Sequence, residues 1–101
     1  MSITSRIDGE GRELIIAIDG RFDFSSHQSF RQSYEGYQFT PESYLIDLSE
    51  TTYMDSSALG MLLLLRDHAG GDRARIRLAH SNPDVRKVLS ISNFEQLFSI
   101  D

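Results

Sequence analysis

Runs of apolar residues separated by polar and glycine-containing turns predict five β-strands in this chain. The second run is apolar at every position, as in a central strand covered on both faces. It follows the first run after the turn 8–11, where glycines supply positive φ, so the two runs predict an antiparallel hairpin. The strands are expected at residues 3–7, 14–18, 44–48, 75–79 and 97–100.

Apolar residues at helical spacing predict three helices between the later strands. The first helix is capped by Asp23, Ser25 or Ser26. The second covers residues 56–69, and the third starts at Asn82, which is followed by proline. Their apolar faces are expected to be Phe30, Tyr34 and Tyr37; Ala58, Leu59, Leu62, Leu65 and Ala69; and Val85, Val88, Leu89 and Ile91, in that order.

The resulting order of elements is ββαβαβαβ. Strands that alternate with helices predict an α/β fold, with a mostly parallel mixed sheet and helices packed on it. The N-terminal hairpin adds an antiparallel edge, and residues 50–53 are expected to form a loop. A length of 101 residues suits one domain, which we expect to cover residues 1–101.

The composition and charge of the chain argue against several classes of protein. The formal net charge of -5 argues against a nucleic-acid-binding protein and against adsorption to an anionic membrane. The longest apolar run, at residues 61–65, is too short to cross a bilayer, and the N-terminal residues contain no apolar signal-peptide core. The absence of cysteine excludes disulfides and thiolate metal sites. We therefore expect a cytoplasmic protein without membrane insertion.

The segment between the strand at 44–48 and the second helix carries the candidate chemistry. Asp55, Ser56 and Ser57 open this helix. Two hydroxyl groups therefore lie at a helix N-terminus, where backbone N–H groups and the helix dipole favour negative charge. The simplest interpretation of Ser56 is a helix cap, and the alternative is a phosphate acceptor.

A helical wheel of residues 56–69 points to a docking surface. Leu64 falls in the middle of the polar side, opposite the apolar face, and Met61 lies at the border of that side. One interpretation is a lone exposed leucine, which is common in globular proteins. The alternative hypothesis is a partner-binding surface, which comprises Ser56, Ser57, Gly60, Met61 and Leu64.

These residues resemble a known family. The segments Met54-Asp55-Ser56-Ser57-Ala58-Leu59-Gly60, Ile46-Asp47-Leu48-Ser49 and Gly20-Arg21-Phe22-Asp23 are similar to the STAS domain of bacterial anti-anti-sigma factors. The segment that starts at Asn82-Pro83 matches as well, so the resemblance extends from about residue 15 to residue 100. It implies a STAS fold.

The resemblance also implies a regulatory function. In such proteins the unphosphorylated form binds an anti-sigma factor, which frees a sigma factor. A serine kinase, often the anti-sigma factor itself, phosphorylates the first serine of the pair, and a PP2C-type phosphatase reverses the reaction. The first serine matches Ser56, with Ser57 as the second choice, and the supporting aspartates of the family match Asp23 and Asp55.

Two positions depart from the family pattern. Ala58 replaces a usual glycine, but it lies on the expected core face, where a methyl group is tolerable. The chain ends at Asp101, where many relatives continue into a last helix. We expect a monomer or a weak dimer.

Other classes of function fit the sequence less well. The nucleophile elbow of a serine hydrolase, Gly-x-Ser-x-Gly, is absent. His27, His68 and His80 lack the spacing of a metal motif, and no phosphate-binding Gly-rich loop indicates a nucleotide site. We therefore expect a non-enzymatic protein without cofactor or metal. The remaining alternative is a constitutive STAS subunit that docks on a transporter ATPase without phosphorylation.

Overall fold

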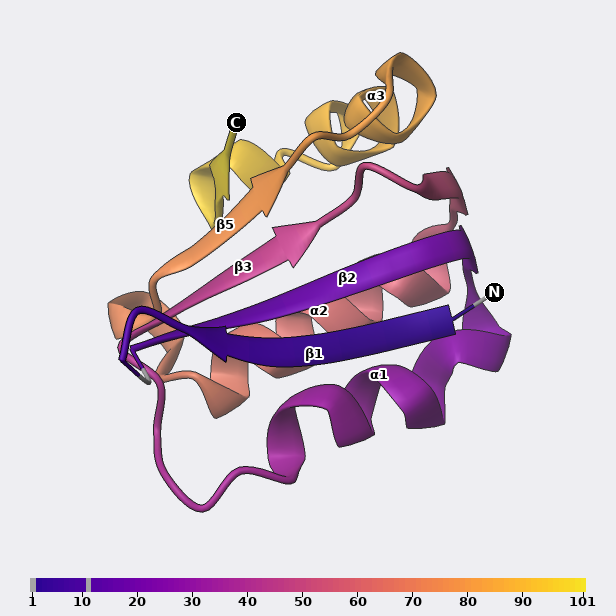
Figure 1. The fold of residues 1–101 in the computed structure, drawn as a ribbon. Coiled ribbons are helices and arrows are strands. Elements are labelled where there is room, and N and C mark those ends of the chain that lie inside the picture. Colours follow the sequence, from indigo (N-terminus) through magenta and orange to yellow (C-terminus); the bar gives the residue numbers. More distant parts are fainter. Residues whose placement is uncertain (1, 11) are drawn as a thin grey trace.

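The long strand β2 is the centre of the sheet, because three other strands pair with it. The computed structural model describes residues 2–10 and 12–101, which form a mixed six-stranded sheet and three α-helices (Figure 1). The strands are β1 (Ser2–Asp8), β2 (Glu13–Phe22), β3 (Ser43–Asp47), β4 (Thr51–Met54), β5 (Ile76–Ala79) and β6 (Ser99–Ile100). The predicted α/β class with a mixed sheet is confirmed.

The N-terminal hairpin is also confirmed, since β1 pairs antiparallel with β2. The turn between them contains Gly9 and Glu10, both with positive φ, and Gly11 lies outside the described residues. All other pairings are parallel. The first half of β2 pairs with β3, which leads to β5 and β6, and its second half pairs with β4.

Strand β4 corrects the prediction of a loop at residues 50–53. The pairing of β2 with β3 ends at Ala17, and its pairing with β4 begins at Gly20. The register of the β2–β4 pairing shifts between Gly20 and Arg21, and Gly20 has a φ of 94°. Thr51 starts β4 and is buried, and its hydroxyl donates to the carbonyl of Ile18 at 2.8 Å. The observed order of elements therefore contains one strand more than predicted, and this strand leads directly into the candidate site.

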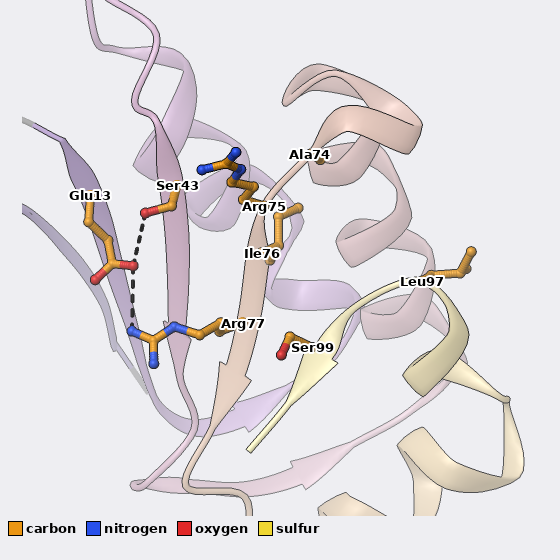
Figure 2. Close-up of a pocket in the computed structure, with 8 residues that line it drawn as sticks. All are labelled: Glu13, Ser43, Ala74, Arg75, Ile76, Arg77, Leu97 and Ser99. Atoms are coloured by element: carbon orange, nitrogen blue, oxygen red, sulfur yellow. Dashed lines mark hydrogen bonds and ion pairs between the residues drawn. The ribbon is translucent and has the colours of Figure 1, made fainter.

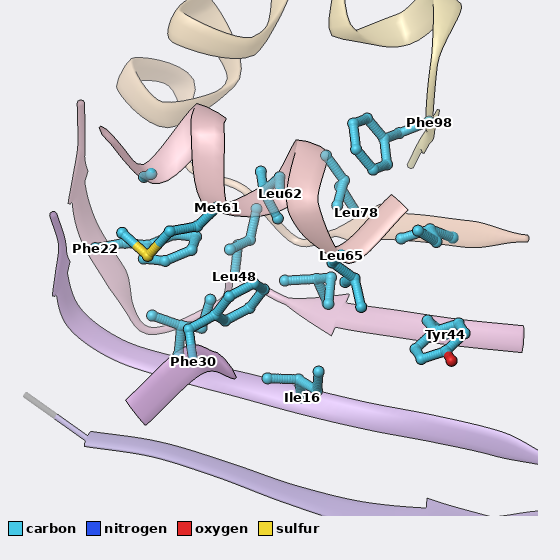
Figure 3. Packing of buried hydrophobic residues seen from close by; sticks show 14 of the residues in the cluster. Ile16, Phe22, Phe30, Tyr44, Leu48, Met61, Leu62, Leu65, Leu78 and Phe98 are labelled. Atoms are coloured by element: carbon cyan, nitrogen blue, oxygen red, sulfur yellow. The ribbon is translucent and has the colours of Figure 1, made fainter. Parts of the chain in front are cut away.

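Helices α1 (His27–Glu35) and α2 (Ser56–His68) cover one face of the sheet, whereas α3 (Pro83–Ile91) lies near β4 and the end of β5 (Figure 1). Phe22, Phe30 and Leu62 lie in the buried layer between these helices and the sheet (Figure 3). This layer includes most of the predicted apolar faces. Ile91 is an exception, because it is the last residue of α3 and is 71% exposed.

Candidate functional site

The start of α2 is held by Asp55. This residue follows β4 and is the N-cap of the helix, with extended backbone angles. Its Oδ1 atom accepts a hydrogen bond from the backbone N–H of Ala58 at 3.1 Å and from the hydroxyl of Ser57 at 2.6 Å. Asp55 therefore performs the capping that the simplest interpretation assigned to Ser56. The hydroxyl of Ser57 is engaged in the same cap.

Ser56 is different from its neighbour. It is the first residue of α2, and its side chain is exposed. Its hydroxyl makes no side-chain hydrogen bond within the part of the chain that the structure describes. The 13-residue helix directs its unpaired N–H groups and the positive end of its dipole toward this position. Of the two serines, Ser56 is thus the accessible one, and its environment suits a phosphate.

Asp23 and Asp55 leave the sheet at the same edge. The last paired residues of β2 and β4 are Phe22 and Met54, and the two aspartates follow them directly. Each aspartate caps a helical turn, and the turn that Asp23 caps, Phe24–Ser26, contacts α2. The structure therefore brings Asp23 and Asp55 close to the start of α2.

Hydrogen bonds hold the Asp23 carboxylate in place. Ser25 donates to its Oδ1 from the hydroxyl at 2.6 Å and from the backbone N–H at 3.0 Å. Arg21 donates from Nε to Oδ2 at 3.3 Å. The Ser25 hydroxyl is the main cause that holds the pKa of Asp23 below its ordinary value, with the Ser25 N–H and Arg21 adding to the effect. Asp23 is therefore a stable anion at neutral pH.

Asp47 has a local structural role. It ends β3, and its Oδ1 accepts a hydrogen bond from the backbone N–H of Ser49 at 3.0 Å. This is the turn interaction of an aspartate with a loop amide two residues further on. This hydrogen bond explains the presence of Asp47 at the end of β3, so we do not include Asp47 in the site at the start of α2.

The exposed face of α2 contains an apolar surface. Leu64 is 50% exposed, as its position on the polar side of the helical wheel predicts, and Leu63 is 39% exposed. Gly60 lies between them and Ser56 on the same face, and a Cβ atom at Gly60 meets nothing within 4 Å. We call the four exposed residues Ser56, Gly60, Leu63 and Leu64 the α2 surface. Phe24, in the adjacent turn, is 77% exposed.

The assignment of Met61 to the docking surface is wrong. Met61 is only 3% exposed and lies close to Phe22 and Phe30 (Figure 3). Helix α2 packs against α1 as well as against the sheet, so its buried arc is wider than that of a helix that faces a sheet alone. The helical wheel did not predict that Leu63 and Phe24 are exposed. Leu63 follows Ser56 and Gly60 at helical spacing, which is a signal that could have identified it.

Ser56 does not line either of two pockets described by residues 2–10 and 12–101. One shallow pocket of about 250 Å³ lies between α1 and α2 and reaches Leu64 on the α2 surface. A pocket of about 370 Å³ lies where β3 and β5 begin, and Figure 2 shows Glu13 bridging Ser43 and Arg77 there. The Glu13 carboxylate is 3.0 Å from the Ser43 hydroxyl and 3.5 Å from an Arg77 nitrogen. Acidic and histidine side chains form no metal-binding cluster in residues 2–10 and 12–101.

Among the described residues, each helix is too short or too polar to cross a membrane.

A comparison with family models matches residues 5–99 to the family described as Mlab, STAS domain. The chain belongs to this STAS family. A STAS-domain containing protein of Pseudomonas aeruginosa (strain UCBPP-PA14) is 61% identical over 100 residues, which cover 99% of each chain. The resemblance to STAS domains is therefore confirmed over nearly the whole chain.

Solved structures show the same fold at low sequence identity. The anti-sigma factor antagonist SpoIIAA in its unphosphorylated form has a TM-score of 0.82 at 19% identity, over 99% of this chain and 88% of that chain. Bacillus SpoIIAA in the phosphorylated form has a TM-score of 0.74 at 18% identity, over 99% and 91%. A sulfate transporter family protein from Wolinella succinogenes has a TM-score of 0.75 at 16% identity, over 95% and 81%. The STAS fold is thus common to antagonists and to a transporter-family protein.

Proposed function

We propose that residues 1–101 act as one STAS domain that antagonises an anti-sigma factor. The unphosphorylated chain binds that factor through the α2 surface, and phosphorylation of Ser56 ends the binding. The observation that carries this proposal is the exposure of Ser56 at the start of α2, with its hydroxyl outside the cap. The likeness to antagonists solved in unphosphorylated and phosphorylated forms supports it.

The modification is a phosphoryl transfer from ATP by a separate serine kinase. The Ser56 oxygen forms a bond to the γ-phosphorus, the bond from that phosphorus to the β–γ bridging oxygen breaks, and the hydroxyl proton leaves as ADP departs. A PP2C-type phosphatase returns the hydroxyl by hydrolysis. The chain itself is a binding protein in this scheme and acts in the cytoplasm.

The phosphate acts through charge at the edge of an apolar surface. It adds about -1.5 to -2 charges at about one helical turn from Gly60 and about two turns from Leu63 and Leu64. A partner that covers these leucines must also cover the phosphate and strip it of water. The carboxylates of Asp23 and Asp55 add repulsion, and the helix N-terminus offsets only part of the cost.

The proposal is tested by capture of partners from the source cell with matched variants. Wild type and Ser57→Ala are expected to retain the anti-sigma factor, whereas Ser56→Asp is expected to lose it. Intact-mass measurement of the protein from cells should show one phosphoryl group on wild type and Ser57→Ala but not on Ser56→Ala. A phosphoryl group that persists in Ser56→Ala would assign the acceptor to another residue.

A constitutive subunit of a transporter ATPase is the second candidate. The exposed side chains of Leu63 and Leu64 form an apolar surface that a partner can bind whether or not Ser56 is phosphorylated. This exposure favours the alternative. Under this alternative, Ser56→Asp leaves binding unchanged and the captured partner is an ATPase. Capture of an anti-sigma factor that Ser56→Asp abolishes would exclude it.

A further inference from the structure

Arg21 has a charged group that only a few surface contacts hold. It is near the end of β2, and its guanidinium carbon is 3.9 Å from the ring centroid of Tyr53 on β4. Its Nε atom is 3.3 Å from Oδ2 of Asp23. The Arg21 side chain is nevertheless 62% exposed. The guanidinium is therefore held by two surface contacts and not by packing, so it is able to change partners.

Strand pairing places the Arg21 side chain at the edge of the sheet where β4 leads into α2. Arg21 is paired with Tyr53, and the next pair, Phe22 with Met54, is buried. Because successive side chains of a strand alternate between faces, Arg21 and Tyr53 project away from the core. The contact with Asp23, two residues further on, shows that the guanidinium extends toward the carboxyl end of both strands. Helix α2 begins at that end.

A phosphate on Ser56 would lie in a part of the chain that carries several carboxylates and few cations. Within residues 19–26 and 49–60, which form this edge of the sheet, Arg21 is the one lysine or arginine. The dianion therefore has one local guanidinium to pair with, besides the helix N-terminus. The charged and titratable groups on this edge and on the neighbouring elements include Asp23, Glu50, Tyr53, Asp55, His27 on α1, and Asp84, Arg86 and Lys87 on α3.

We propose that Arg21 is the internal ligand of a phosphate on Ser56. On phosphorylation the guanidinium exchanges the Asp23 carboxylate for the phosphate dianion and stays near the Tyr53 ring. The exchange is favoured because a dianion attracts a guanidinium more strongly than a single carboxylate does and can accept two parallel hydrogen bonds. Asp23 keeps both hydrogen bonds from Ser25 when Arg21 leaves.

This inference rests on the proposed phosphorylation of Ser56. It adds which residue of the chain binds the phosphate after that reaction. Pairing with Arg21 reduces the repulsion between the phosphate and the two aspartates. It also directs the phosphate toward the Tyr53 side of the helix start. Arg21 is thus a positioning residue, which stabilises the modified state without contacting ATP.

The test uses phosphoserine placed at position 56 during translation, so that no kinase is needed. ³¹P NMR titration then measures the second pKa of the phosphate. It should be lower with Arg21 than in Arg21→Gln, by about half a unit or more, because a guanidinium stabilises the dianion. Arg12→Gln is the matched control, since Arg12 pairs with Glu42 where β2 begins, at the opposite end of that strand. It should leave the phosphate pKa unchanged.

A second measurement needs no substitution of Arg21. The Nε–H resonance of Arg21 should shift between the unphosphorylated and phosphorylated wild-type chains. Equal phosphate pKa values in Arg21→Gln and Arg12→Gln, or an Arg21 resonance that does not respond to the phosphate, would overturn the proposal. Because the phosphate is installed by translation, these results are separate from the question of whether a cell phosphorylates Ser56.

Discussion

Ser56 and Ser57 are adjacent in the chain, but their hydroxyl groups have different surroundings. The helical pattern identified the pair at a helix start, whereas the division of roles depends on Asp55. Its carboxylate takes both the Ala58 N–H and the Ser57 hydroxyl. The sequence allows Ser56 or Asp55 to be the cap, because both residue types cap helices well. The backbone angles at Asp55, which follow from the end of β4, decide between them.

Loss of the Asp55 cap should destabilise the protein. Asp55→Ala removes the acceptor for the Ala58 N–H and the partner of Ser57, so we expect a loss of about 1 kcal/mol in the free energy of unfolding. Asp55→Asn is the control, because an asparagine oxygen still accepts from that N–H and should retain most of the stability. Urea unfolding followed by circular dichroism measures both. Equal stability of Asp55→Ala and wild type would contradict the assignment of the cap.

Asp23 should make stability depend on pH in acid. Its hydrogen bonds lower its pKa in the folded state, so its contribution is fully present above the unfolded value of about 3.8. The contribution is lost as pH falls through the lower folded pKa, because the folded state must then bind the proton. Wild type should therefore be more stable than Asp23→Asn at neutral pH, and the difference should shrink below about pH 3.8. A difference between the two urea midpoints that is constant from pH 7 to pH 3 would contradict this.

At the scale of elements, the helical wheel of α2 predicts the exposure of Leu64 but not the burial of Met61. Leu64 is exposed as predicted, since it lies opposite the residues that face the sheet. Met61 lies at the border of the wheel, where the outcome depends on whether another helix packs there. Helix α1 does, and it buries Met61. A wheel contains no information about a helix from another part of the chain.

Substitutions at Met61 and Leu64 should differ in their effect on stability. Met61→Ala should lower the free energy of unfolding by about 2–5 kcal/mol, because it opens a cavity beside Phe22 and Phe30. Leu64→Asp should change it by less than about 0.5 kcal/mol, because Leu64 is half exposed. Binding to the captured partner should weaken in Leu64→Asp. A stability loss in Leu64→Asp as large as that in Met61→Ala would show that Leu64 belongs to the core.

Strand β4 could not be recognised from local pattern alone. It has four residues, and its two middle residues, Thr52 and Tyr53, are exposed, so it shows no alternation of apolar and polar positions. Its pairing partner, the second half of β2, is about 30 residues away in the chain. The fold class and the strands β1, β2, β3 and β5 follow from period and turn chemistry, whereas β4 follows from contacts between distant segments.

At the scale of the whole molecule, the proposed switch lies outside the core. The sheet and its helices form a continuous buried cluster, and Ser56 is exposed at its margin. Asp55 holds the first turn of α2 whether or not Ser56 carries a phosphate, since its bonds go to Ser57 and Ala58. We therefore expect phosphorylation to change the charge of the surface and to leave the packing of the sheet intact.

Hydrogen exchange can separate a surface switch from a conformational one. The amides of residues 14–18 should exchange slowly in both forms, because this part of β2 is largely buried and all of it except Ile18 pairs with a strand on both sides. Phosphoserine at position 56 should alter exchange only at the first turn of α2 and around Arg21. The two-residue strand β6 lies at an edge and should exchange fast in either form. If the phosphate instead accelerates exchange in residues 14–18, the switch acts by loosening the sheet, and repulsion at the α2 surface is not the mechanism.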